Sequence, residues 1–363
     1  MKDLLQQARE IINRVDKQMA DLFVERMHAA EMVAEYKKAH GLEILDTARE
    51  EEVVRRNSAY VEDEKIRGYY VNFLKNNMEV SRSYQSEIMQ GMRVAFCGTE
   101  GAFAHIATTK LFPTARKIAY GDFESAYRAV ENGECDVAVL PIENSFNGEV
   151  GQVTDLMFSG SLYVNGVMEL AVTHNLLGTK DATIDDVKQV VSHAQALGQC
   201  AGYIKEHGFE SIEYVNTALA AKFVSEKNDK SLAAIASVEA ADVFGLKVLD
   251  HNVNTSSSNT TRFAVLSRSE TKHSTKEMGI HTVLLFTVRN QAGALAKAIE
   301  IVGKHGFNMR TLRSRPMKEL LWQYYFYIEA EGNINSQEGQ EMMKELSHYC
   351  DRLKAVGTYV KKD

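Results

Sequence analysis

The first 90 residues of the chain contain no proline and only two glycines, Gly41 and Gly68. These two residue types are the ones that most disfavour a helix interior, so their scarcity favours long helices. Apolar residues recur at helical spacing over residues 4–33, and Thr47 and Glu50 are spaced as a capping box. The expected helices run from near the start of the chain to Gly41, from residue 46 or 47 onward, and over residues 65–89.

The pattern changes at Arg93, where short apolar runs begin to alternate with helical stretches. The runs that indicate buried strands are residues 94–96, 137–140, 190–191 and 232–236. This alternation predicts an α/β domain with a mainly parallel sheet. The segment ends near Leu266, and the polar run 267–279 is interpreted as a linker.

The residues after this run follow the order strand, helix, strand, strand, helix, strand. The expected ranges are 282–288, 293–304, near 309, 323–330, 336–349 and near 358. This is the βαββαβ order of ferredoxin-like domains. The predicted fold class is therefore multidomain α and α/β, with an all-helical domain (1–90), an α/β domain (92–268) and a βαββαβ domain (279–363).

Composition narrows the classes of partner. A net charge of -7 disfavours nucleic acid, because a phosphate-binding protein needs a basic surface. No run approaches the roughly 18 apolar residues of a membrane helix, and no signal peptide is recognisable, so a cytoplasmic protein without membrane partners is expected. The four cysteines form no Cys-x-x-Cys pair and the histidines show no metal-ligand spacing, so neither a metal nor another cofactor is expected.

Cationic residues in the first helix have an informative spacing. Arg26 and Lys37 are 11 positions apart, so they share a helix face with Cα atoms roughly 16 Å apart, and both can reach one small dianion. Arg9 lies roughly 25 Å from Arg26 on a straight helix and on a different face. If all three bind one kind of ligand, Arg9 must reach into a site on another chain, which predicts an intertwined dimer.

Eight polar residues of this segment resemble the all-helical chorismate mutases in type and spacing: Arg9, Arg26, Lys37, Asp46, Arg49, Glu50, Ser81 and Gln85. The resemblance implies that Arg26 and the partner's Arg9 bind the two carboxylates of chorismate. It also implies that Lys37 and Gln85 donate to the ether oxygen. The substrate's hydroxyl and a carboxylate would be positioned by the others, Asp46, Arg49, Glu50 and Ser81.

The chemistry suits such a site. A Claisen rearrangement needs no acid, base or nucleophile, but it needs the reacting arm held over the ring and donors aimed at the oxygen that gains charge. Taken singly, each of these residues has a simpler interpretation as a solvated charge on a helical bundle.

Polar motifs lie at the ends of the predicted strands of the α/β domain, where open α/β sheets place ligands; the first three follow a strand and the last precedes the final strand. The four motifs are Gly98 to Ala104, Pro141 to Ser145 with Gly148 and Val150, Ser192 to Gln195 with Gln199 and Cys200, and Asn259 to Phe263. Singly they are weak, since a glycine-rich turn is usually a loop and His193 alone is more often structural.

Together and in this order, the motifs resemble the prephenate dehydratases over residues 93–268. The resemblance implies two α/β lobes, like a periplasmic binding protein, with prephenate in the cleft between them. The family's catalytic threonine falls on Thr261. Substrate contacts are implied for Asn144, Ser192, Gln199 and Arg262. Three positions depart from the family's usual pattern: Thr99 and Ala194 stand where proline is usual, and Ala104 where a hydroxyl residue is usual.

The last domain is similar to the ACT regulatory domains of prephenate dehydratases, which bind phenylalanine at a dimer interface. The residues that carry the resemblance are Gly293, Ala294, Leu295, Asn308, Ser314, Arg315 and Pro316. Small residues at a helix N-terminus let backbone N–H groups approach the effector's carboxylate. Arg313 stands where the family usually has glutamate, so a domain that only dimerises is the alternative.

The three resemblances together identify the chain as similar to bifunctional chorismate mutase–prephenate dehydratases with an ACT domain. They imply synthesis of phenylpyruvate from chorismate, feedback inhibition by phenylalanine, and a homodimer or tetramer. Two alternatives stay open. One is a dehydratase that prefers arogenate, and the other is an amino-acid-responsive binding protein whose catalytic cleft has decayed.

Overall fold

The computed structural model describes residues 4–255, 259–274, 277–317 and 323–361, so residues 275 and 276 of the predicted linker lie outside the described ranges. The chain divides into two compact units, residues 1–93 and 94–363. Among the residues that the structure describes, no helix has the length and apolar character needed to span a membrane.

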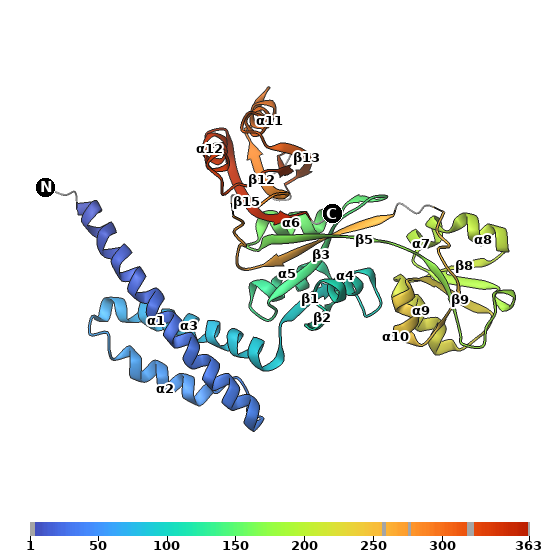
Figure 1. Cartoon of the computed structure of the whole chain (residues 1–363), viewed down its shortest axis with the longest axis horizontal. Coiled ribbons are helices and arrows are strands. Elements are labelled where there is room, and N and C mark those ends of the chain that lie inside the picture. Colours follow the sequence, from blue (N-terminus) through green and yellow to red (C-terminus); the bar gives the residue numbers. More distant parts are fainter. Residues whose placement is uncertain (1–3, 256–258, 275–276, 318–322, 362–363) are drawn as a thin grey trace. The chain divides into compact units, whose positions relative to one another are not determined.

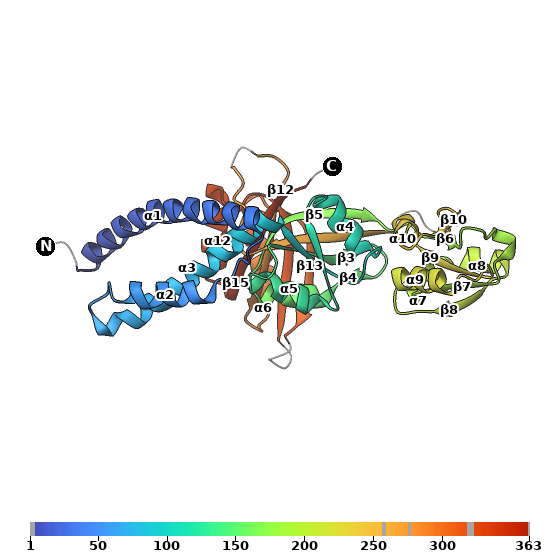
Figure 2. The same ribbon diagram turned by 90° about the horizontal axis from the view of Figure 1, so that it is seen from below.

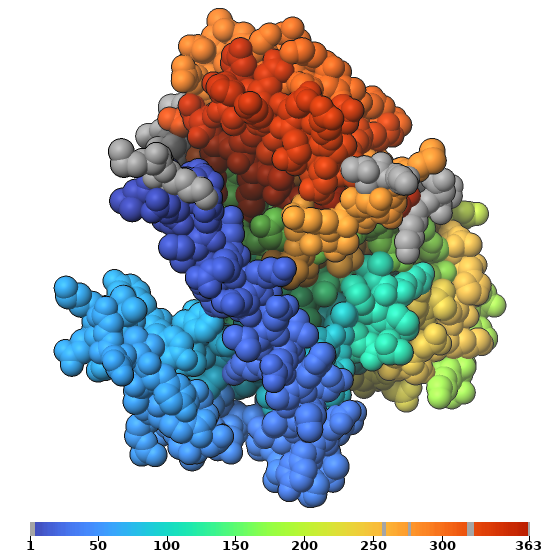
Figure 3. Space-filling view, turned by 60° about the vertical axis from the view of Figure 1, so that its left-hand side comes forward, coloured from blue at the N-terminus to red at the C-terminus, as the bar shows by residue number. Residues whose placement is uncertain are grey.

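The first unit consists of three helices, α1 (Leu4–His40), α2 (Thr47–Ser58) and α3 (Glu64–Gln90), as the sequence predicts (Figure 1). Both α1 and α2 pack against α3. Ala30 and Ala34 are the buried residues of α1. Large apolar side chains along the rest of this helix stay exposed, among them Leu4 at 80% and Leu22 at 63%, and Figure 3 shows much of its surface uncovered.

Helix α2 begins at Thr47, as predicted, but its cap differs from the prediction. Asp46 is its N-cap, and the carboxylate accepts a hydrogen bond from the Arg49 amide at 3.0 Å. Glu50 is instead ion-paired with Arg82 of α3. The predicted capping box of Thr47 and Glu50 is therefore wrong, because the aspartate one residue earlier already caps the helix.

The second unit begins with a lobe built on a sheet of order β2-β1-β3-β11-β5, with β4 paired to β3. Its elements are β1 (Arg93–Cys97), α4 (Phe103–Leu111), β2 (Arg116–Tyr120), α5 (Phe123–Glu131), β3 (Val137–Asn144), β4 (Gly148–Glu149), α6 (Gly151–Ser159), β5 (Tyr163–Ala171) and β11 (Thr260–Ser267).

A second lobe has a sheet of order β10-β6-β9-β7-β8. Its elements are β6 (Asn175–Gly178), a 3-10 turn (Ile184–Asp186), β7 (Gln189–Ser192), α7 (Ala194–Gln199), α8 (Ala201–His207), β8 (Glu210–Glu213), α9 (Thr217–Lys227), β9 (Leu232–Ala236), α10 (Val238–Phe244) and β10 (Lys247–Asp250). Helices α7 and α8 contribute to one hydrophobic core, and α9 and α10 to another. Figures 1 and 2 show both lobes.

Both lobe sheets are mixed, so the expected mainly parallel sheet is wrong. Strand β11 returns from the second lobe and lies antiparallel between β3 and β5. In the second lobe, β6 lies antiparallel between β9 and β10. These pairings join segments that are far apart in sequence, which is why alternation of strands and helices did not reveal them.

The C-terminal elements follow the predicted βαββαβ order: β12 (Ile280–Val288), α11 (Ala294–Lys304), β13 (Asn308–Pro316), β14 (Tyr324–Glu331), α12 (Gln337–Leu346) and β15 (Cys350–Val360). The sheet order is β13-β14-β12-β15, with antiparallel neighbours throughout.

Strand β12 shows how this sheet is covered on both faces. Leu284 and Phe286 join the core beneath α11 and α12, whereas Val283 and Leu285 join the core of the first lobe. Successive strand residues point to opposite faces, so one buried strand supplies both cores. The C-terminal sheet and the first lobe therefore share a continuous hydrophobic core.

Candidate functional site

In the helical unit, Arg26 of α1 reaches across to α3. Its Nη1 donates to the carbonyl oxygen of Asn77 at 3.2 Å, to Asn77 Oδ1 at 3.1 Å, and to the Ser81 hydroxyl. Burial lowers the pKa of the Arg26 guanidinium, which remains far above neutral pH. The contacts fix a cation at the seam between α1 and α3.

Gln85 lies one helical turn beyond Ser81 on the same face of α3. Both side chains are buried, and the buried Oε1 of Gln85 has no hydrogen-bond partner within the described chain. Leaving such an atom unpaired costs about 1–3 kcal/mol. This buried oxygen, one turn beyond the Ser81 that contacts Arg26, is therefore an acceptor that a polar ligand can pair.

Lys37 lies on the Arg26 side of α1, since the helix is continuous between them. Its Nζ donates to the carbonyl oxygen of Ile44 at 2.5 Å. The seam thus brings together Arg26, Ser81 and Gln85, with Lys37 on the same helix face.

The remaining predicted mutase residues lie elsewhere in this unit. Asp46 caps α2, and Arg49 is exposed and bonds Glu52 at 2.6 Å. Arg9 is exposed on α1. Sequence reasoning missed Asn77, whose position one turn before Ser81 was the available signal, and Arg82, whose contact with Glu50 joins two helices.

In the second unit, a cavity of about 390 Å³ opens between the two lobes. The first lobe contributes the start of α4, the ends of β3 and β4, and the start of β11, while the second contributes α7 and the start of α9. Of the predicted residues, Asn144, Gln199 and Thr261 line it. His193 lines it too, at the N-cap of α7.

The Asn144 side chain is fixed from both ends. Its Oδ1 accepts hydrogen bonds from the amides of Phe146 at 3.0 Å and Asn147 at 3.1 Å. Its Nδ2 donates to the Thr261 hydroxyl at 2.9 Å and to Asn259 Oδ1 at 2.8 Å. Because Thr261 Oγ1 accepts this bond, its own proton remains available for a bound molecule.

The hydrogen-bonded network at the cavity extends from Asn259 to Gln199 and His174. Gln199 Oε1 accepts from Asn259 Nδ2 at 2.9 Å and lies 2.9 Å from His174 Nε2. Burial lowers the pKa of His174, although the bond to Gln199 acts in the opposite direction, so the ring is neutral at neutral pH. With Nε2 as the donor, Nδ1 is an acceptor without a partner among the described residues.

His174 and Asn259 were not among the predicted site residues. Asn259 stood at the start of a recognised motif, which was a usable signal. His174 follows β5, in a segment that no motif marked, so the sequence offered little to distinguish it from the other histidines.

Two predicted substrate contacts are not at this cavity. Ser192 is fully buried and donates to the carbonyl oxygen of Ile235 in β9 at 2.6 Å. Arg262 follows Thr261 within β11, so it points to the opposite face of the sheet. There it donates to Glu143 at 3.2 Å and to Glu329 at 2.8 Å.

The predicted effector residues lie at both ends of the C-terminal sheet. Gly293 is the N-cap of α11 with φ 83, and Ala294 and Leu295 follow it in the helix. Strand register aligns Arg315 with Tyr325 and Tyr325 with Thr287, so Ser314 to Pro316 lie at the end of the sheet that leads to Gly293. Asn308 is at the other end, where its Nδ2 donates to Glu331 at 2.8 Å.

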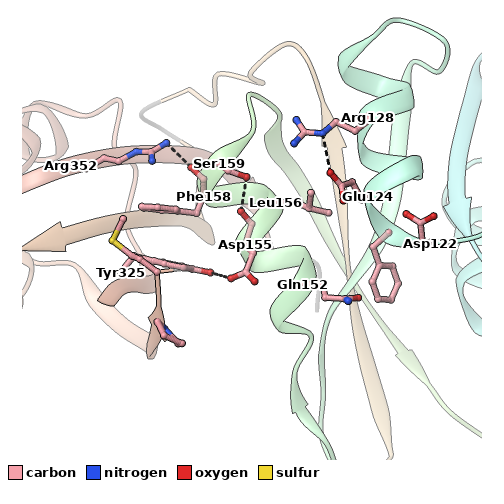
Figure 4. A pocket seen from close by; sticks show the side chains of 13 residues that line it. Asp122, Glu124, Arg128, Gln152, Asp155, Leu156, Phe158, Ser159, Tyr325 and Arg352 are labelled. Carbon is pink, nitrogen blue, oxygen red and sulfur yellow. Dashed lines mark hydrogen bonds and ion pairs between the residues drawn. The ribbon is translucent and has the colours of Figure 1, made fainter. Parts of the chain in front are cut away.

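A further cavity, of about 460 Å³, lies between helices α5 and α6 and the C-terminal sheet (Figure 4). Asp155 accepts from Arg315 Nε at 2.8 Å and from the Tyr325 hydroxyl at 2.6 Å. Arg352 lies over the Phe158 ring, 4.2 Å from its centroid. These charged and aromatic groups contact one another, and they join the first lobe to the C-terminal sheet.

Within the described ranges, no group of three or more His, Cys, Asp or Glu side chains is arranged so that it could bind a metal ion. Two family models match the chain: one is described as Chorismate mutase type II, over residues 8–86, and the other as Prephenate dehydratase, over residues 94–271. Each contains one of the two groups of polar residues described above.

Similar proteins extend these matches. The bifunctional chorismate mutase/prephenate dehydratase of Neisseria gonorrhoeae is 30% identical over 364 residues, or 98% of this chain and 97% of the relative. A solved structure described as GqqA, a novel type of quorum quenching acylase, is 31% identical with a TM-score of 0.69, covering 74% of this chain and 98% of that one. Prephenate dehydratase from Arthrobacter aurescens, solved in complex with L-Phe, is 24% identical with a TM-score of 0.69, covering 74% and 90%.

Proposed function

The chain belongs to the family of bifunctional chorismate mutases/prephenate dehydratases, and we propose from this premise how its residues carry out the two reactions. The enzyme rearranges chorismate to prephenate and converts prephenate to phenylpyruvate, with loss of water and carbon dioxide, in phenylalanine biosynthesis. The observation that carries this function is the joint match of a mutase model and a dehydratase model within one chain that aligns almost end to end with a bifunctional relative.

In the mutase reaction, Arg26 binds one substrate carboxylate and the partner's Arg9 binds the other. Lys37 and Gln85 donate to the ether oxygen as its bond to the ring breaks, and their donors act more strongly on the charged transition state than on chorismate. The buried position of Gln85 on the same face of α3 as Ser81, which contacts Arg26, supports this role. The substrate's hydroxyl and a carboxylate are positioned by Asp46, Arg49, Glu50 and Ser81.

A second copy of the chain completes the mutase site. The support is the exposed apolar surface of α1, including Leu4, Leu22 and Met32 at 80%, 63% and 71% exposure. Apolar surface of this extent on one helix is unfavourable in water and is normally buried against another helix. The assembly is a homodimer, or a tetramer made of two such pairs.

In the dehydratase reaction, prephenate occupies the cavity between the lobes. The electrons of its bond to the departing carbon dioxide enter the ring, the bond to the ring hydroxyl breaks, and the leaving oxygen takes a proton from Thr261 to depart as water. Solvent returns a proton to Thr261. Asn144 supports this role because it occupies the acceptor side of the threonine hydroxyl, and Gln199 donates to the substrate through the free part of its amide.

The C-terminal domain acts as an ACT regulatory domain that binds phenylalanine and inhibits the dehydratase. Support comes from the βαββαβ order and from the positive φ of Gly293 at the start of α11, a conformation that favours glycine. A prephenate dehydratase of the same fold was solved with L-Phe. We assign the domains to residues 1–90, 92–268 and 279–363 and the enzyme to the cytoplasm.

The alternatives have less support. A dehydratase that prefers arogenate would not need a fused mutase, because the mutase makes prephenate directly. A decayed binding protein would not be expected to retain the Thr261–Asn144 hydrogen bond at the cavity. The acylase activity named for one similar structure belongs to a protein that aligns with 74% of this chain, whereas the bifunctional relative aligns with 98%.

Separating the two activities tests the proposal. A Lys37→Met variant should lose mutase activity and keep dehydratase activity on added prephenate. The same preparations should convert prephenate with a higher kcat/KM than arogenate. Equal loss of both activities in the variant, or a preference for arogenate, would contradict the assignment.

A further inference from the structure

Two neighbouring residue pairs link β11 to β3 at the dehydratase cavity. The antiparallel register aligns Thr261 with Asn144 and Arg262 with Glu143. The first pair faces the cavity, where Asn144 donates to the Thr261 hydroxyl at 2.9 Å. The second pair faces the C-terminal sheet, because adjacent strand residues point to opposite faces.

On that second face, four charged side chains of alternating sign are in contact. Glu143 uses both carboxylate oxygens, since Oε1 pairs with Arg313 of β13 and Oε2 accepts from Arg262 at 3.2 Å. Arg262 also donates to Glu329 of β14 at 2.8 Å. We name Arg313, Glu143, Arg262 and Glu329 the charge chain. Each end of it is held by the C-terminal sheet, and its middle two members adjoin the cavity pair.

The charge chain is largely shielded from water. The Glu329 side chain is 3% exposed, and those of Arg262 and Arg313 are 16% and 19% exposed. Burial is the largest single influence and disfavours the Glu329 carboxylate, but the hydrogen bond and charge of Arg262, the hydrogen bond from Tyr359 and the charge of His281 together hold its pKa below the ordinary value. Glu329 also accepts from the Tyr359 hydroxyl at 2.7 Å. Ion pairs in such surroundings are screened little by salt and have restricted geometry.

We propose that the charge chain positions the Thr261–Asn144 pair for dehydration, and that Arg313 is a positioning residue for this reaction. The proposal rests on the dehydratase role of Thr261. A glutamate at position 313, as in the related ACT motif, would place its carboxylate against Glu143 and repel it. Arg313 therefore makes the C-terminal sheet part of the dehydratase scaffold. Its contact with Glu143 forms without a bound effector.

The test is steady-state kinetics of the full-length enzyme with prephenate and, separately, with chorismate. Arg313→Met should lower the dehydratase kcat about tenfold, equivalent to about 1.4 kcal/mol, with KM for prephenate within about twofold. Arg313→Lys, which keeps the positive charge, should recover most of this loss. Mutase kcat/KM should be unchanged in both variants, because the charge chain lies outside the helical unit.

Arg310→Met is the matched control. It removes the same charge from β13, but Arg310 is exposed and pairs with Glu331 rather than with Glu143, so dehydratase kcat should stay at the wild-type value. A double-mutant cycle of Arg313→Met and Glu143→Gln should show less than additive loss, since both remove one contact.

A dehydratase kcat for Arg313→Met equal to that of Arg310→Met would overturn the proposal, even if the thermal midpoint fell. Loss in the methionine variant without recovery in the lysine variant would also overturn it. Failure of the underlying function looks different, because Thr261→Ala would then retain dehydratase activity whatever the state of Arg313.

Discussion

Replacement of Thr261 by valine isolates the hydroxyl that dehydration is proposed to use. Valine keeps the branched shape of threonine, so the cavity wall changes little. The hydroxyl oxygen accepts from Asn144 at 2.9 Å, and in the proposed mechanism its proton goes to the substrate. The two functions have separable costs.

The structural cost is small. Asn144 Nδ2 also donates to Asn259 Oδ1 at 2.8 Å and to the Thr260 carbonyl oxygen at 3.2 Å. Losing one of three acceptors costs about 1 kcal/mol of folding stability, the usual net value of a neutral hydrogen bond. The catalytic cost is larger, since a positioned proton donor contributes about 100-fold to 10,000-fold in rate. Dehydratase kcat should therefore fall at least about 100-fold while the protein stays folded.

The assay follows phenylpyruvate formation from added prephenate, with mutase activity measured on the same sample as an internal control. Thr261→Ser, which retains a hydroxyl, should keep most of the dehydratase activity. If the valine variant turned over prephenate within a factor of a few of the wild-type rate, the proton-donor role of Thr261 would be refuted.

Three other outcomes are expected. Gln85→Leu should lower mutase kcat by about 100-fold or more, the usual effect of removing a donor to a developing negative charge, while dehydratase kinetics stay constant; retained mutase activity would exclude that donor. Glu329→Gln should destabilise the second unit by about 1–3 kcal/mol near neutral pH, because it removes the most buried of the carboxylates that pair with Arg262 and leaves the more exposed Glu143 and Glu169. Because the folded pKa of Glu329 is depressed, its stabilisation is present above about pH 4.3 and is lost as pH falls below that value. Denaturant unfolding should therefore show that the difference in unfolding free energy between wild type and the Glu329→Gln variant becomes smaller in acid. A difference that stays constant with pH would contradict this linkage. Calorimetry should detect saturable phenylalanine binding. Gly293→Val should weaken this binding, because the positive φ at Gly293 disfavours a branched side chain. If millimolar phenylalanine gave no heat of binding, phenylalanine would be excluded as the effector.

The helical unit was the most predictable part of the chain. Its helices are long, and the face that packs on α3 is set by local periodicity, so Arg26 and Lys37 could be placed together from their spacing alone. The contacts that each side chain makes could be predicted less well from the sequence. That Arg26 bonds Asn77 and that Glu50 bonds Arg82 depends on how α3 packs, which no local pattern encodes.

In the α/β lobes, the motifs were found but the strand ends were misplaced. Strand β3 continues to Asn144 and β11 starts at Thr260, so both motifs lie within strands and not beside them. This boundary decides which side chains reach the cavity. Once Thr261 and Arg262 are consecutive strand residues, only one of them can face the substrate, and the other becomes available to the C-terminal sheet.

The departure at Arg313 illustrates a different limit. From sequence alone, a charge reversal in a regulatory motif indicates a loss of effector binding. Its partner, Glu143, is 170 positions away in the chain, and only the packing of the C-terminal sheet on the first lobe shows that the new charge is compensated.

The most direct measurement of the central claim supplies the purified full-length chain with chorismate alone and follows ultraviolet absorbance. Chorismate should disappear, prephenate should form transiently, and phenylpyruvate should accumulate without any added enzyme or cofactor. A preparation that leaves chorismate unchanged, or that accumulates prephenate as the final product, would contradict the account of one chain with two working sites.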